Sequence, residues 1–158
     1  TISDLFRAAL RDPADWLPLS EEIALCRQYL ELEKLRLGER LQVEWDIRSV
    51  PLDAPIPPLM LQPLVENAIF HGIETANQGG TLRIMFSAKN NELTIEVANP
   101  NCSAPRQARG NQMALANIRE RLALYYDLEA RLEIDQSGPL YRIRIVLPCV
   151  TKKDRSPS

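Results

Sequence analysis

Two neighbouring pairs of strand-like segments limit the folds open to this chain. Segments 81–88 and 92–98 alternate apolar and polar residues and are separated by only three residues, which fits a hairpin connection. Segments 130–135 and 141–147 form a second such pair. A doubly wound fold would need a helix between successive strands. The sequence therefore predicts an α+β fold, a two-layer sandwich with a mixed or antiparallel sheet covered by helices on one face.

The other elements follow from helical spacing and turn residues. Ser20 is a favourable N-cap and Gly38 a favourable stop for a helix between them. Residues 99–111 lack apolar periodicity, so we expect a long loop there, of the kind that often covers a binding site. A fifth strand is expected at 41–47, and further helices at 2–10, 59–72 and 113–126.

Composition excludes several classes of protein. The chain has 158 residues, 45% of them hydrophobic and 25% charged, which is ordinary for one globular domain. A net charge of -2 gives no basic field for nucleic acid or for an anionic membrane. Cys26, Cys102 and Cys149 are odd in number and lack CxxC spacing, which disfavours a disulfide framework or a zinc site and favours a reducing compartment. No stretch reaches the roughly 18 apolar residues of a membrane span.

Segment 61–72 is the best candidate for a functional site. Its apolar residues have the spacing of one buried helix face, while Asn67 and His71, four residues apart, share another stripe. An Asn amide oxygen suits a hydrated Mg²⁺, which takes few protein ligands, and a nearby imidazole can reach a phosphate oxygen. The alternative is that this polar pair is simply the solvated side of an amphipathic helix.

Three stretches, in this order along the chain, resemble motifs of the LytS/YehU-type sensor histidine kinases. Segment 29–37, YLELEKLRL, is similar to the YLxIExxRF stretch of that family. Segment 61–72, LQPLVENAIFHG, resembles its N box, LQPLVENAIKHG, and 110–122, GNQMALANIRERL, resembles GxGIGLxNxxxRL. The likeness covers about 2–148 and implies a Bergerat-type (GHKL) ATP-binding domain with a mixed sheet of about five strands.

The resemblance also assigns roles to residues. Asn67 would ligate Mg²⁺ at the ATP phosphates, with Glu66 as a possible base or supporting residue beside it. Phe70 and His71 would line the phosphate region. The residues implied for the adenine and the lid over it are Asn99, Asn101, Gly110, Gln112, Ala114 and Leu115. Arg119 and Arg121 follow the lid and are expected on the solvated side of their helix.

Several of these positions depart from the family pattern. Asn99 stands where the family has an Asp that accepts a hydrogen bond from adenine, so the charge-assisted part is lost. Gln112 and Ala114 replace glycines, and Phe70 replaces a basic residue. We therefore expect weaker ATP binding than in a standard sensor kinase. Pro63 occupies the place of the catalytic Glu of other GHKL ATPases, which disfavours a third reading, an ATP-hydrolysing clamp.

The function implied is phosphoryl transfer from Mg-ATP to a His in an upstream segment, and from there to an Asp of a response regulator, of LytTR type. The phosphoacceptor stretch of the family, NPHFLFN, does not occur in this sequence, so autophosphorylation of the chain alone is not expected. A degenerate domain that serves as a regulator-binding scaffold is the alternative. We expect 1–12 to be the remnant of an upstream dimerisation helix, 13–150 the catalytic domain and 151–158 a disordered tail. The full protein would be a homodimer in the inner membrane, with this domain in the cytoplasm and touching neither membrane nor nucleic acid.

Overall fold

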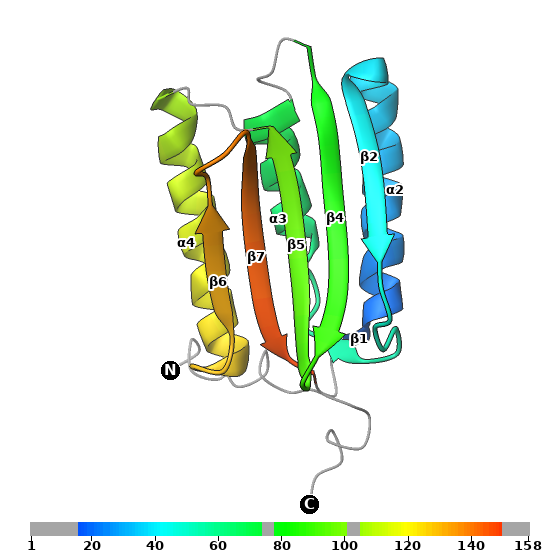
Figure 1. Cartoon of the computed structure of the whole chain (residues 1–158), viewed down its shortest axis with the longest axis vertical. Helices are drawn as coiled ribbons and strands as arrows, with labels where there is room; N and C mark the ends of the chain where they lie inside the picture. Colours follow the sequence, from blue (N-terminus) through cyan, green and yellow to red (C-terminus); the bar gives the residue numbers. More distant parts are fainter. Residues whose placement is uncertain (1–15, 74–77, 101–104, 150–158) are drawn as a thin grey trace, which may run out of the picture.

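A five-stranded mixed sheet forms one layer of the molecule (Figure 1). The computed structural model describes residues 16–73, 78–100 and 105–149. The strand order is β2-β4-β5-β7-β6, in which β2 and β4 are parallel and the other neighbours antiparallel. The strands are β2 (Leu41–Ile47), β4 (Gly80–Lys89), β5 (Glu92–Pro100), β6 (Arg131–Asp135) and β7 (Leu140–Pro148), with a separate short pair of β1 (Leu17–Pro18) and β3 (Pro55–Ile56). The predicted α+β sandwich is confirmed.

Helices cover one face of this sheet (Figure 1). They are α2 (Leu19–Leu37), α3 (Gln62–Ala68) and α4 (Pro105–Tyr126), with a 3-10 turn at Gly38–Arg40 and a π turn at Ile69–Ile73. Figure 1 shows α3 in the middle, flanked by α2 and α4. The core lies between the layers, where alternate residues of the central strands, such as Ile84, Ile95 and Ile143, are fully buried. Burial of these apolar faces is what holds the two layers together.

The opposite, open face of the sheet carries charged pairs. Arg83 bonds to Glu44 across β4 and β2, and Arg144 bonds to both Glu96 and Glu133 across β5, β7 and β6. Along β4 and β7 the charged residues alternate with buried ones, as expected for a sheet with one solvated face, whereas Glu96 of the central strand β5 is itself only 6% exposed. The charges largely neutralise one another, so this face has no field of a single sign.

Local turn chemistry explains two of the predicted boundaries. Asn90 and Asn91 have φ of 55° and 63°, and Lys89 pairs with Glu92, so the β4–β5 hairpin turns through the left-handed region that Asn tolerates. The helix α2 ends at Gly38, whose φ of 62° suits a residue without a side chain. Both features confirm expectations from the sequence.

The predicted start of α2 was wrong by two residues. The N-cap position is Pro18 and not Ser20, the helix begins at Leu19, and no side chain caps it. The amides of Leu19 and Ser20 instead donate to the carbonyls of Ala54 and Leu52, both at 2.9 Å. A neighbouring loop thus satisfies the first amides of the helix, which removes the need for a side-chain cap.

The predicted loop 99–111 was also wrong. Asn99 and Pro100 belong to β5, and α4 already begins at Pro105 instead of Met113. Proline is favourable in the first turn of a helix, and most residues from 106 to 112 have good helix propensity. The prediction relied on apolar periodicity, which this first part of α4 lacks. Residues 101–104 lie outside the described ranges. In the part of the chain that the structure describes, no helix is long and apolar enough to cross a lipid bilayer.

Candidate functional site

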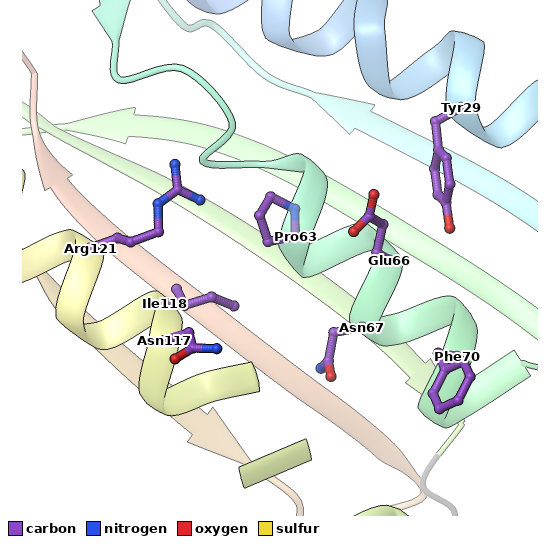
Figure 2. A pocket seen from close by; sticks show the side chains of 8 residues that line it. All are labelled: Tyr29, Pro63, Glu66, Asn67, Phe70, Asn117, Ile118 and Arg121. Atoms are coloured by element: carbon purple, nitrogen blue, oxygen red, sulfur yellow. The ribbon is translucent and has the colours of Figure 1, made fainter. Parts of the chain in front are cut away.

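A cavity of about 530 Å³ lies between the three helices on the covered face of the sheet (Figure 2). α2 contributes one side chain, α3 three, the π turn that follows it one, and α4 three. The lining residues are Tyr29, Pro63, Glu66, Asn67, Phe70, Asn117, Ile118 and Arg121. α3 runs along the middle of this space, so the segment singled out from the sequence supplies half of the lining.

Among the described residues that line the cavity, Asn67 is the one with a buried polar atom that lacks a hydrogen-bond partner. Its side chain is only 6% exposed, and its Oδ1 atom has no hydrogen-bond partner among the described residues. Figure 2 shows the amide leaving α3 towards α4, where Asn117 points back at it. A buried acceptor without a partner costs free energy, so such groups call for an explanation. An amide oxygen is a suitable ligand for Mg²⁺, and the position therefore fits the metal that the motif implies. The alternative reading, in which Asn67 lies on the solvated side of its helix, is wrong for this residue.

α3 does not continue as an α-helix beyond Ala68, the residue after Asn67. After Ala68 the backbone widens into the π turn Ile69–Ile73, a feature that is frequent at functional sites. The predicted stripe of Asn67 above His71 assumed an unbroken α-helix. The π turn changes the rotation between the two residues, and the side chain of His71 lies outside what the structure describes.

The end of strand β5 meets this π turn. Asn99 is 4% exposed, and its Nδ2 atom donates to the carbonyl of Pro100 at 2.9 Å. A Cβ atom at Gly72 would lie 2.0 Å from Nδ2 of Asn99, so the glycine allows the two segments to approach. Asn99 is thus brought to the C-terminal end of α3, although it does not line the cavity.

The remaining candidates divide between the cavity and the core. Glu66 lines the cavity and accepts a bond from Nε2 of Gln62 at 3.0 Å, and Phe70, 60% exposed, lies at its rim. Leu115 is buried in the core cluster and does not line the cavity. Asn101 lies outside the described residues; Gly110, Gln112 and Ala114 belong to α4, but nothing of their side chains is described.

Two charged side chains hold the segment that leads into α3. Glu22 of α2 is 1% exposed, and it accepts bonds from the amides of Leu59 at 2.7 Å and Leu61 at 3.5 Å. Arg121 of α4 donates from Nη1 to the carbonyl of Leu59 at 2.6 Å and from Nη2 to that of Pro58 at 2.8 Å. Burial raises the pKa of Glu22, and the amides and the positive charge of Arg121 oppose this only in part.

Sequence reasoning missed these two residues. Arg121 was expected on the solvated side of its helix, which is wrong, because its guanidinium bonds to backbone carbonyls at the cavity. Glu22 was not among the candidate residues. Its position four residues before Cys26 and eight before Leu30 places it on the buried stripe, which is the signal that would have found it. Asn117, facing Asn67, was also not among the predicted ligands.

Solved structures with this arrangement are histidine kinases. The catalytic domain of histidine kinase ThkA, in a nucleotide-free form, matches with a TM-score of 0.65 and 11% identity, over 85% of this chain and 96% of that one. The fold is that of a histidine kinase catalytic domain. Full-length ShkA in complex with AMPPNP matches with a TM-score of 0.63 and 21% identity, over 87% of this chain and 32% of that one.

Relatives with similar sequences include sensor proteins and sensor histidine kinases. The sensor protein LytS of Enterococcus faecalis is 28% identical over 81% of this chain and 24% of its own length. The sensor histidine kinase BtsS of Escherichia coli is 32% identical over 93% of this chain and 26% of its own. A family model described as histidine kinase matches residues 1–41, which include α2. The chain is thus similar to LytS-type sensor histidine kinases and spans about a quarter of the length of these relatives.

Proposed function

We propose that this chain is the catalytic and ATP-binding domain of a LytS-type sensor histidine kinase, and that Mg-ATP binds in the cavity between α3 and α4. The observation that carries the proposal is the buried Oδ1 atom of Asn67, which faces the cavity without a partner. The kinase fold and the AMPPNP complex of ShkA support it.

Asn67 would hold the Mg²⁺, which neutralises phosphate charge when bound. Glu66, beside it on α3 and also lining the cavity, would support Asn67 or act as a base. Phe70 and His71 would line the phosphate region. The adenine and the lid over it would involve Asn99, Asn101, Gly110, Gln112, Ala114 and Leu115.

The same residues predict modest affinity. Phe70 brings no positive charge to the rim of the cavity, and Asn99 offers a neutral amide where a carboxylate would bind adenine more strongly. Each loss is worth about 1 to 3 kcal/mol, the range for hydrogen bonds to charged groups. Binding should therefore be weak and should depend on Mg²⁺.

In the full protein, we propose that the γ-phosphoryl group passes to a His in an upstream segment and then to an Asp of a LytTR-type response regulator. Residues 1–12 would be the end of an upstream dimerisation helix, 13–150 the catalytic domain and 151–158 a tail. The full protein would be an inner-membrane homodimer, with this domain in the cytoplasm. The motifs resemble those of an alginate-regulating sensor of the family, which makes alginate synthesis the proposed setting.

A calorimetric titration with AMPPNP and Mg²⁺ tests the proposal. The wild-type chain should bind weakly, and Asn67→Ala should lower the affinity by about tenfold or more, since it removes a ligand of a charged group. Gln28→Ala, which deletes an exposed amide on α2, is the matched control and should leave the affinity unchanged. Equal binding by wild type and Asn67→Ala would place the nucleotide elsewhere.

A regulator-binding scaffold without nucleotide turnover is the second candidate. It is favoured by Asn99 at the end of β5, where a carboxylate is expected, and by the exposed ring of Phe70. If neither the wild-type chain nor the variants bind AMPPNP at millimolar concentration, the scaffold replaces the kinase domain as the better account.

A further inference from the structure

Leu59, three residues before α3, has an unusual backbone conformation. Its φ is 59°, in the left-handed region, which is a genuine outlier for a bulky residue that is not glycine. Its side chain is half exposed, so packing of that side chain does not explain the conformation. A strained residue of this kind persists only where its surroundings hold it in place.

Both polar backbone groups of Leu59 are held by charged side chains from different helices. Glu22 of α2 accepts from its amide at 2.7 Å, and Arg121 of α4 donates to its carbonyl at 2.6 Å. The same carboxylate reaches the amide of Leu61, and the same guanidinium reaches the carbonyl of Pro58. Hydrogen bonds to charged groups are stronger than those between neutral groups. We call this arrangement the Glu22–Arg121 clamp.

The Glu22–Arg121 clamp holds the segment that leads into α3, the helix that carries Asn67, the candidate metal ligand. Pro63 and Asn67 are one turn apart on α3, and Arg121 and Asn117 are one turn apart on α4. Figure 2 shows Arg121 beside Pro63, and Asn117 opposite Asn67, so the two helices present matched pairs across the cavity. A shift of α3 at its start would therefore move Asn67 relative to Asn117.

We propose that Glu22 and Arg121 are positioning residues: by clamping Leu59 they fix where α3 begins and so hold the amide of Asn67 towards α4. The inference rests on the proposed function for what the cavity binds. The clamp itself needs no ligand. Both terminal nitrogens of Arg121 are engaged by carbonyls, so this side chain acts through the backbone and not on a phosphate.

The first test uses amide hydrogen exchange by NMR on the chain without nucleotide. In Arg121→Gln, the amides of Leu59 and Leu61 should exchange about tenfold faster or more, because the carbonyl side of the clamp is lost. The side-chain amide signals of Asn67 should shift as well. Arg119→Gln is the matched control, because it removes the same charge from an exposed site two residues away on α4, and it should change neither readout.

Arg121→Lys separates positioning from general stability. A Lys ammonium can reach one of the two carbonyls, so exchange at Leu59 and Leu61 should fall back towards the wild-type rate, and the Asn67 signals should return with it. If Arg121→Gln unfolds the chain, the Lys variant decides: the proposal then requires a smaller increase in exchange, confined to Leu59 and Leu61, because one of the two carbonyl bonds is lost. Uniform loss of protection in the Lys variant, or unchanged exchange and unchanged Asn67 signals in a folded Arg121→Gln, would overturn the proposal.

Nucleotide affinity provides the link to function. Arg121→Gln should weaken binding of Mg²⁺ and AMPPNP several-fold, with Arg119→Gln equal to wild type. Wild-type affinity in a folded Arg121→Gln would overturn the link between the clamp and the site. Failure of the wild-type chain to bind AMPPNP would remove the proposed function, and the exchange rates and the Asn67 signals would still decide the clamp.

Discussion

Apart from Glu96, the charged side chains on the open face of the sheet pair with one another in contact with solvent, whereas Glu22 on the helix-covered face is buried and bonds to backbone amides. Burial raises the pKa of Glu22. On the open face, the bond from Arg131 lowers the pKa of Glu133, which is 45% exposed. We therefore expect the exposed ion pairs of this domain to contribute little to the free energy of unfolding, whereas a few buried polar groups determine how its helices are arranged.

The largest expected effect is on the covered face. Glu22→Ala leaves the amides of Leu59 and Leu61 without an acceptor and Arg121 without its nearby negative charge. The free energy of unfolding should fall by about 2 to 4 kcal/mol, the cost of breaking a buried charged network. Urea unfolding measures it. Glu21→Ala, an exposed neighbour, is the control, and equal losses in both variants would contradict the burial argument.

The pH dependence should have opposite signs on the two faces. A carboxyl group whose pKa is raised on folding stabilises the protein fully below the unfolded pKa, near 4.5, and loses that stabilisation as the pH rises through the folded pKa. The difference in unfolding free energy between wild type and Glu22→Gln should therefore fall as the pH rises above about 4.5. For Glu133→Gln the difference should rise with pH below that value, because its pKa is lowered. Urea unfolding at a series of pH values checks both signs.

Asn67 should differ from Glu22 although both are buried. Because its Oδ1 atom has no partner among the described residues, Asn67→Ala should change the free energy of unfolding by no more than about 1 kcal/mol. The free energy of unfolding should increase if removing the unpaired acceptor outweighs the packing that is lost. Thermal and urea unfolding of the chain without nucleotide provide the measurement. A loss as large as that of Glu22→Ala would mean that Asn67 is a structural residue and not one kept for a ligand.

The smallest effect is expected on the open face. Arg83→Ala removes the ion pair with Glu44, in which the two side chains are 56% and 55% exposed. Exposed pairs are typically worth about 0.2 to 1 kcal/mol, so the change in urea midpoint should be small and should shrink further in high salt. A loss above that of Glu22→Ala would reverse the comparison of the two faces.

Local patterns in the sequence predict much of this fold. Alternation predicts the strands of the sheet, Asn90 and Asn91 predict the hairpin, and Gly38 predicts the end of α2. The first part of α4 was missed because it has good helix propensity but lacks the apolar stripe on which the prediction of helices relied. Asn67 became the candidate ligand because the motif and the helical spacing point to the same residue.

The Glu22–Arg121 clamp cannot be predicted from local sequence patterns, for a physical reason. Its bonds join residues 37 to 63 positions apart, and neither the left-handed φ of Leu59 nor the loop carbonyls that cap α2 have a local sequence signal. A charged residue on a buried helical stripe, as at Glu22, indicates a buried partner without saying which one. The partner becomes known only when the helices are packed.

Paramagnetic broadening by Mn²⁺ tests most directly whether Asn67 is a metal ligand in a nucleotide site. With AMPPNP present and Mn²⁺ replacing Mg²⁺, the side-chain amide signals of Asn67 should broaden beyond detection before those of Gln28, which lies on the exposed side of α2. The same Mn²⁺ concentration without nucleotide should leave the Asn67 signals visible, because one amide alone binds the ion weakly. Sharp Asn67 signals at saturating Mn²⁺ and AMPPNP would contradict the account.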